Sequence, residues 1–415
     1  MRKRIICLAL LLLIQITTFC WGATAAQALT EEQKLFNEAW RIVSQAYVDN
    51  TFNDQNWWLV RQKALRQPLQ NREATYAAIQ QMLASLNDPF TRLLKPAQYQ
   101  SLQTSTTGEL TGVGLQITLN SQTGYLEVIT PVEGSPAAQA GLQPRDQILK
   151  IDDSSTKELT LDEAAEKMRG PIGSSVRLTV LPQQSDQEAI QPLEIQLTRD
   201  RIALNPVQTQ LHSQPEGGGI GYIRLSQFNA NATREMLQAI NRLEIQGADR
   251  YILDLRSNPG GLLQAGVEIA QLWLDPSTIV HTVDRQGILG SFTANRKALT
   301  HDPLAVLVNR GTASASEILA GALQDNGRAK VVGENTFGKG SIQSLFNLSD
   351  GSGLAVTIAH YETPNHHNIN KIGIQPDRVV PLNPITPEQV GTEADGQYQA
   401  AVELLNAPPV LAGAA

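Results

Sequence analysis

Cysteine is nearly absent from this 415-residue chain, which contains only Cys7 and Cys20. Both lie within residues 1–28, which have the features of a secretory signal peptide: a basic start at residues 2–4, the apolar run Ile5–Ile14 and small residues suited to cleavage. We expect the mature chain to have no disulfide, thiolate metal site or cysteine nucleophile. An uncleaved anchor stays open as an alternative, although an apolar run of about ten residues is too short to span a bilayer.

Positive charge is also in deficit. The chain has 33 Lys and Arg residues against 40 Asp and Glu residues, a net charge of −7, and losing the three basic residues of the leader would make it −10. Because an acidic protein binds nucleic acid poorly, we expect no nucleic-acid partner. The 41% hydrophobic and 18% charged residues are typical of a globular protein, and the length allows two or three domains.

Histidine is scarce, and no complete cofactor motif is present. His366 and His367 are adjacent, but no H-E-x-x-H motif or nearby set of acidic ligands accompanies them, so we expect no metal. Residues 333–339 match G-x-x-x-x-G-K, yet Gly340 stands where a phosphate loop needs Ser or Thr for magnesium. We therefore expect a chain that works without a cofactor.

Hydrophobic periodicity divides the rest of the chain into four regions and predicts a multidomain α+β protein. Residues 29–104 have helical spacing, and residues 105–200 alternate in the manner of a small β-rich domain. Residues 201–385 alternate strand and helix, and residues 386–415 are expected to form a short helix and a frayed tail. In the first region we expect the aromatic residues, including the pair Trp57-Trp58, to lie in the core.

The strand–helix alternation of residues 201–385 predicts a largely parallel sheet, whose sites form where strands end and helices begin. Tyr251–Leu255 has the pattern of a buried strand, and Asn258–Gly261 follows it as a loop. Asp254 and Arg256 flank the end of this strand. They either form an ion pair that braces the loop or belong to an ordinary surface pair worth about 0–1 kcal/mol.

Ser314 follows the apolar run Leu304–Val308 and precedes a helical pattern, so it is expected at a strand-to-helix turn. Backbone N–H groups and the helix dipole favour negative charge there, which suits a nucleophile whose intermediate carries an oxyanion. Ser314 and Glu317 also match the S-x-x-E capping box, so a purely capping serine stays open. Lys339 lies between two glycines and is a candidate base if burial keeps its amine neutral; His360 is the alternative base.

Three motifs carry a resemblance to a known family: Asn309–Ile318, Gln324–Ala329 and Thr336–Gly340. Their order and spacing resemble the carboxyl-terminal processing proteases, which are Ser–Lys endopeptidases with a PDZ domain. The resemblance implies an α/β core of the crotonase-like and ClpP-like type, with Ser314 as nucleophile and Lys339 as general base.

The same resemblance implies the remaining site residues. It assigns Asp325 as an acidic site residue and Gln343 as the group that orients the lysine amine. It gives the oxyanion hole to the N–H groups of Gly260 and Ala315. Asp254, Arg256 and Glu317 are expected in supporting positions, the last as a helix cap.

Residues 105–200 resemble a PDZ domain in the order of their predicted elements. In such domains the N–H groups of a glycine loop bind a free C-terminal carboxylate, and the peptide adds a strand to the sheet. The resemblance assigns this role to the loop Gly112, Val113, Gly114 and Leu115. The expected partner is therefore a protein with a free C-terminus.

Three patches in the helical region, Glu38–Arg41, Asn56–Trp58 and Asp88–Arg92, resemble the photosynthetic branch of this family, which trims the precursor of the D1 reaction-centre protein. We therefore predict an exported endopeptidase of the thylakoid lumen or periplasm that removes C-terminal extensions, with the membrane-associated D1 precursor as substrate. The alternatives are a general periplasmic tail-specific protease and a non-catalytic PDZ protein that only binds peptides.

Overall fold

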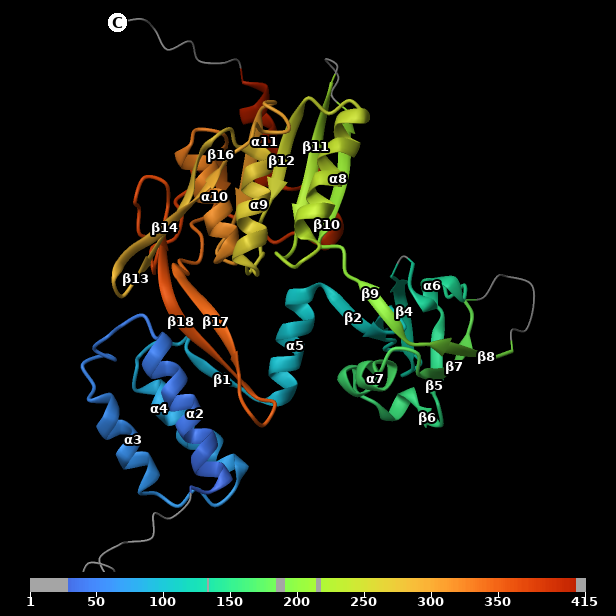
Figure 1. The fold of residues 1–415 in the computed structure, drawn as a ribbon. Coiled ribbons are helices and arrows are strands. Elements are labelled where there is room, and N and C mark those ends of the chain that lie inside the picture. The colour runs from blue at the N-terminus through green and yellow to red at the C-terminus, as the bar shows by residue number, and fades with distance from the viewer. Residues whose placement is uncertain (1–28, 133, 184–190, 214–217, 408–415) are drawn as a thin grey trace, which may run out of the picture. The chain divides into compact units, whose positions relative to one another are not determined.

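The computed structural model describes residues 29–407, apart from residue 133 and the segments 184–190 and 214–217. The leader expected at residues 1–28 lies outside the described residues. The expected multidomain α+β fold is confirmed, and Figure 1 shows the course of the chain. None of the helices in the described part combines the length and the apolar character that a bilayer crossing requires.

The chain forms two compact units. The smaller contains the residues up to Pro96 together with Gln343–Ile358, and the larger contains Ala97–Ile342 and Ala359–Ala415. The later segment of the smaller unit carries most of β17 (Ser341–Asn347) and the first part of β18 (Gly353–Glu362). The domain boundaries read from the sequence stay predictions.

The smaller unit is built on three helices, as the apolar spacing predicts: α2 (Glu31–Ala46), α3 (Trp57–Leu65) and α4 (Arg72–Ala84). Each begins at a residue whose side chain accepts a backbone N–H of the first turn, namely Thr30, Asn56 and Asn71. The short strand β1 (Arg92–Leu94) follows and pairs antiparallel with β18. Leucine and valine side chains from β18 complete the apolar core between the helices.

The expectation that the aromatic residues of this region are buried is wrong for Trp58. Trp57 is 5% exposed, whereas the Trp58 side chain is 56% exposed. Successive residues of a helix point about 100° apart, so α3 can turn only one of two adjacent tryptophans into the core.

The β-rich region begins after α5 (Pro96–Thr107) and forms an antiparallel sheet of order β3-β4-β5-β7-β8. Its elements are β2 (Glu109–Gly112), β3 (Leu115–Leu119), β4 (Leu126–Pro131), α6 (Pro136–Gln139), β5 (Gln147–Ile151), β6 (Ser154–Ser155), α7 (Leu161–Met168), β7 (Ser175–Leu181), β8 (Leu193–Thr198) and β9 (Asp200–Ala203). β6 pairs with β5, and β2 pairs with β9. β3 is therefore an edge strand of this sheet.

A six-stranded sheet of order β10-β11-β12-β15-β16-β19 forms the α/β core. Its elements are β10 (Val207–Ser213), β11 (Gly219–Leu225), α8 (Ala232–Ile245), β12 (Arg250–Asp254), α9 (Leu263–Trp273), β15 (Leu304–Val308), α10 (Ala315–Asp325), β16 (Lys330–Gly333) and β19 (Arg378–Val379). All neighbouring strands are parallel except β10 and β11. The predicted βαβ arrangement is thus present.

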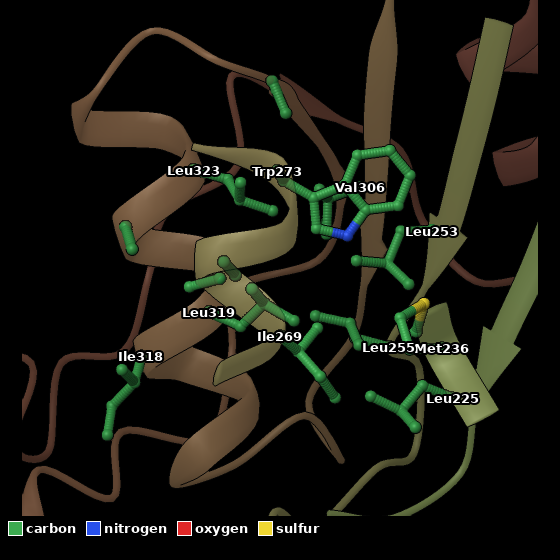
Figure 2. Close-up of a cluster of buried hydrophobic side chains, with 14 of the residues drawn as sticks. Leu225, Met236, Leu253, Leu255, Ile269, Trp273, Val306, Ile318, Leu319 and Leu323 are labelled. Carbon is green, nitrogen blue, oxygen red and sulfur yellow. The ribbon is translucent and has the colours of Figure 1, made fainter. Parts of the chain in front are cut away.

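Both faces of this sheet are covered. Because successive side chains of a strand point to opposite faces, Leu253 joins the core beneath α8, α9 and α10, whereas Ile252 joins a second core on the other side. Figure 2 shows the first core, where residues of β12 and β15 pack against Trp273 of α9 and Leu319 of α10. The second core includes Tyr398 from the C-terminal helix.

The C-terminal region contains the short helix that the sequence indicates. α11 (Gly396–Asn406) packs Tyr398, Ala401 and Leu405 against the sheet, and these side chains are at most 9% exposed. It is thus an integral layer of the core; residues 408–415 lie outside the described residues.

A hairpin that the sequence analysis does not predict completes the larger unit. β13 (Ser277–Asp284) and β14 (Gly287–Ala294) pair with each other, and β13 pairs with the last residues of β18. This pairing sets Tyr361 of β18 opposite Thr282.

Candidate active site

The candidate residues gather where parallel strands end. β12, β15 and β16 are neighbours in the sheet, and each leads into a loop at its C-terminal end. The three loops contain Gly260, Ser314 and Lys339, respectively. The topology therefore brings together segments that lie far apart in the sequence, as expected for this type of sheet.

Ser314 occupies a sharp turn between β15 and α10, as predicted. Its backbone angles are φ 59° and ψ −119°, a conformation that residues with a Cβ rarely adopt. Such backbone strain costs on the order of 1–3 kcal/mol and persists only where the surroundings impose it. A serine on a strained strand-to-helix turn has an exposed hydroxyl in hydrolases with a nucleophile elbow.

Glu317 is fully buried, and its carboxylate connects this turn to the loop between β16 and β17. This loop, residues 334–340, contains Lys339 and is called the lysine loop below. It accepts four hydrogen bonds: from the N–H groups of Ser314 (2.8 Å), Gly338 (2.7 Å) and Lys339 (2.9 Å), and from the Thr336 hydroxyl (2.5 Å). The predicted cap of α10 is thus present in its Glu317 half. The bonds to the lysine loop have no signal in the sequence, because they join residues that are distant along the chain.

Lys339 lies in a loop held close to another segment of the chain. Its side chain is partly buried. At Gly340, an added Cβ would lie 2.7 Å from the Asn370 backbone nitrogen, so the close approach requires glycine. The loop leads into strand β17 and not into a helix, and its Gly338 and Lys339 N–H groups bind Glu317, which excludes a phosphate loop.

The glycine loop after β12 lies directly against the Ser314 turn. A Cβ placed on Gly260 would be 2.8 Å from the Ser314 Cβ and 2.9 Å from the Ala315 nitrogen, so the two predicted oxyanion donors lie in adjoining segments. In this conformation the Gly260 N–H donates to Asn258 Oδ1 at 2.9 Å. An oxyanion would therefore have to compete with Asn258 for this N–H.

Asn258 also connects the two loops directly. Its carbonyl oxygen accepts the Ala313 N–H and the Ser316 hydroxyl, each at 3.0 Å. Its side-chain amide donates to the Leu225 carbonyl at 2.8 Å. The sequence does not mark this fully buried residue as a site residue, because an Asn-Pro-Gly sequence is also typical of an ordinary turn.

Asp254 and Arg256 form a buried ion pair, with 2.6 Å between Arg256 Nη2 and Asp254 Oδ2. Arg256 also binds Asp395 at 2.7 Å, and the Tyr222 hydroxyl donates to Asp254 at 2.6 Å. Burial on its own lowers the pKa of Arg256, but the bonds from its guanidinium to both carboxylates outweigh burial and raise it. The sequence left open whether this pair braces the loop or is an ordinary surface ion pair. Since both side chains are buried, it is not a surface pair, and it braces the end of β12 from inside the protein.

One predicted site residue, Asp325, is not brought to Ser314. Asp325 is the last residue of α10, so about 15 Å of helix separates it from the Ser314 end. Its carboxylate accepts the Asn365 N–H at 2.9 Å and lies 3.8 Å from His367. Gln343 belongs to the smaller unit, where its amide donates to the Thr357 hydroxyl at 3.3 Å, and its orienting role stays a prediction.

The histidines offer neither a metal site nor an obvious base. Within the described residues no group of His, Cys, Asp and Glu side chains is arranged to hold a metal ion. His360 precedes Tyr361 on β18, and the Tyr361 hydroxyl contacts the Ser314 carbonyl. Since neighbouring strand residues point to opposite faces, His360 points away from Ser314.

The loop Gly112–Leu115 runs from the last residue of β2 to the first residue of β3, the strand at the end of its sheet. The Val113 carbonyl accepts the Ala137 N–H, and the Gly114 carbonyl accepts the Ser135 hydroxyl. In a trans peptide the N–H points opposite to the carbonyl, so the N–H groups of Gly114 and Leu115 point away from these partners. This geometry is compatible with the predicted carboxylate-binding loop.

Sequences of known proteins align with most of this chain. Residues 219–380 match the model of peptidase family S41, and residues 127–182 match a PDZ domain. The carboxyl-terminal-processing protease of Synechocystis sp. is 58% identical over 403 residues, which cover 97% of this chain and 93% of the relative. Its counterpart from Picosynechococcus sp. is 57% identical over 413 residues, covering 99% and 98%.

A solved structure has a similar fold. The photosystem II D1 C-terminal processing protease aligns with a TM-score of 0.57 and 41% sequence identity, over 88% of this chain and 99% of the solved one. The carboxyl-terminal-processing peptidase 2 of Arabidopsis thaliana, a chloroplastic protein, is 46% identical over 90% of this chain and 73% of its own length.

Proposed function

This chain belongs to peptidase family S41 as a serine-type carboxyl-terminal-processing protease, and we propose that Ser314 is its nucleophile and Lys339 its general base. The observation that carries this proposal is the buried Glu317 carboxylate, which binds the backbone N–H groups of both residues. A nucleophile and a base must share a fixed geometry, and a common hydrogen-bond acceptor supplies it.

In the proposed reaction the neutral Lys339 amine takes the proton of the Ser314 hydroxyl, and the Ser314 oxygen attacks the scissile carbonyl carbon. The oxyanion forms next to the Ala315 N–H at the start of α10, where the helix dipole stabilises negative charge. As the C–N bond breaks, the protonated lysine gives its proton to the leaving amine. Lys339 then activates a water that hydrolyses the ester and releases Ser314.

The lysine must be neutral to act, which requires partial removal from water. Its partly buried side chain and the glycine-lined loop around it are consistent with that requirement. Arginine would not replace it, because a guanidinium stays protonated. The mechanism requires neither a metal nor a cofactor.

We further propose that the substrate is the C-terminal extension of the D1 precursor and that the protein acts in the thylakoid lumen. The support is the 41% identity to the solved D1 C-terminal processing protease and the cyanobacterial or chloroplastic origin of several relatives. The loop Gly112–Leu115 would bind the free carboxylate of the substrate and β3 its last residues. A general tail-specific protease and a non-catalytic peptide-binding protein are the alternatives.

The test compares the wild type with Ser314→Ala on a peptide that carries the D1 precursor C-terminus. We expect the wild type to release the extension and Ser314→Ala to be inactive with an unchanged circular dichroism spectrum. An active-site-directed serine reagent should modify the wild type at Ser314, as read by mass spectrometry. Cleavage by Ser314→Ala would refute the assignment, and cleavage of unrelated tails at equal rates would favour the general protease.

A further inference from the structure

We propose that Tyr361 is a positioning residue that holds Ser314 and Lys339 in their reactive arrangement. This inference rests on the proposed roles of those two residues. The Tyr361 hydroxyl is 3.0 Å from the Ser314 carbonyl oxygen and also hydrogen-bonds to the Lys339 carbonyl oxygen. One side chain thus contacts the backbone of the nucleophile and that of the base.

Tyr361 complements Glu317. The carboxylate of Glu317 accepts the N–H groups of Ser314 and Lys339, and the hydroxyl of Tyr361 lies at the carbonyl groups of the same two residues. For both Ser314 and Lys339, the backbone N–H is therefore held by the Glu317 carboxylate and the backbone carbonyl by the Tyr361 hydroxyl. A rotation of either backbone would break bonds at both ends.

The hydroxyl is well suited to remain a donor. Tyr361 is 1% exposed, and burial, followed by the nearby Glu317 carboxylate, raises the pKa of its phenol well above the ordinary value. The group therefore keeps its proton at neutral pH. A phenol has one proton, so the two carbonyl oxygens share a single donor, and removing it affects both.

The strand that carries Tyr361 is itself fixed. Tyr361 pairs with Thr282 of β13, and its own N–H donates to the Gly340 carbonyl at 3.0 Å. The lysine loop is thus bound by the strand backbone at Gly340 and by the side chain at Lys339. A site residue supported from a regular strand keeps its geometry better than one supported from a loop.

The chain offers a matched control in Tyr251. Both tyrosines belong to the same apolar core, and Tyr251 is 0% exposed. Its hydroxyl has no hydrogen-bond partner in the described part of the chain. Tyr251→Phe therefore removes a buried phenol oxygen, as Tyr361→Phe does, but breaks no hydrogen bond.

The experiment measures kcat and KM of full-length wild type, Tyr361→Phe and Tyr251→Phe on the D1 precursor peptide. A misplacement of about 1 Å costs on the order of 10²-fold in rate, so we expect Tyr361→Phe to lower kcat at least tenfold with KM unchanged. Its Ser314 should also react more slowly with the serine reagent. Tyr251→Phe should match the wild type in both measurements.

Two further variants at position 361 separate positioning from folding. 4-Fluorophenylalanine fills the space of tyrosine without a donor and should reproduce the kcat loss, even where Tyr361→Phe folds poorly. 4-Aminophenylalanine restores a neutral donor and should recover most of kcat. Equal kcat for the fluoro and amino variants, or a Tyr361→Phe kcat equal to that of Tyr251→Phe, would overturn the inference.

Ser314→Ala is measured in the same series. If it cleaves the peptide, the proposed function itself fails. If Ser314→Ala is inactive while Tyr361→Phe retains wild-type kcat, only the role of Tyr361 is refuted.

Discussion

At the scale of single residues, the site is defined by backbone groups as much as by side chains. Ser314 has a strained backbone, and Glu317 uses its carboxylate to bind main-chain N–H groups from two loops. A strained turn persists only if such contacts over-determine it. The strained backbone of Ser314 therefore lowers the stability of the fold, and the hydrogen bonds to Glu317 offset this loss.

Replacing Ser314 should reveal the strain. Alanine keeps the Cβ and so keeps the unfavourable φ of 59°, whereas glycine relieves it. We expect Ser314→Gly to have a free energy of unfolding about 1 kcal/mol higher than Ser314→Ala, although both are inactive. Urea denaturation measures this difference, and a lower stability of the glycine variant would mean that the turn is not strained.

Glu317→Gln should damage both stability and activity. An amide nitrogen cannot accept the N–H groups that the carboxylate now accepts, so we expect a loss of about 1–3 kcal/mol in the free energy of unfolding. The kcat should fall, since the amide nitrogen replaces one of the two oxygens: either Ser314 and Lys339 lose their shared acceptor, or Thr336 and Gly338 lose theirs and the lysine loop loosens. Glu334→Gln, in which the glutamate is 3.9 Å from exposed Arg310, is the control and should change neither quantity. A Glu317→Gln variant with wild-type kcat would contradict the role given to this carboxylate.

At the scale of elements, the C-terminal helix α11 is bound to β12, the strand that leads to the loop Asn258–Gly261. Asp395 caps α11 through the N–H groups of Gln397 and Tyr398 and also binds Arg256 at the end of β12. Burial on its own raises the pKa of Asp395, but the bonds from Arg256 and the Gly391 N–H outweigh it, so the pKa is lowered. The ionised carboxylate is thus the form that the fold stabilises.

This arrangement predicts a pH-dependent effect of Asp395→Asn. A carboxyl group with a lowered folded-state pKa stabilises the protein above its unfolded pKa of about 3.9 and loses this effect as the pH falls through the folded value. We expect the variant to lose about 3 kcal/mol of unfolding free energy at neutral pH and the difference to shrink below about pH 4. Asparagine still caps a helix, so the change isolates the ion pair.

The control for Asp395→Asn is Glu403→Gln, which removes an exposed partner of Arg378 and should cost less than about 1 kcal/mol. Denaturant titrations at several pH values measure both variants. A difference for Asp395→Asn that stays constant from neutral pH down to pH 2 would contradict the account.

Strong local patterns made many elements predictable from the sequence. The apolar run at Leu304–Val308 is a fully buried strand, and a helix, α10, follows Ser314, as the spacing indicates. What the sequence could not reveal are contacts between distant segments, such as Arg256 with Asp395 or Tyr361 with Ser314. No local spacing relates such residues, and only the packed sheet brings them together.

At the scale of the whole molecule, the chain has one loop proposed to bind a chain end and one site proposed to cleave an upstream peptide bond. The loop Gly112–Leu115 precedes an edge strand, and the Ser314 turn lies at the end of the parallel sheet. We expect a protease built this way to select substrates by their free C-terminus and to cut at a distance from it.

Binding should therefore depend on the substrate carboxylate. We expect full-length Ser314→Ala to bind a peptide with a free C-terminus at least about tenfold more tightly than the same peptide with an amidated C-terminus, because charged acceptors form stronger bonds to N–H groups. Fluorescence anisotropy with labelled peptides measures both affinities. Equal affinities would show that the chain end is not what the protein recognises.

The central claim is that Lys339 activates Ser314, and the kcat/KM of Lys339→Ala on the D1 precursor peptide tests it most directly. We expect a loss on the order of 10³-fold or more, with the same loss for Lys339→Arg and none for His360→Ala. Wild-type kcat/KM in Lys339→Ala, together with a loss in His360→Ala, would contradict the claim and give the base to the histidine.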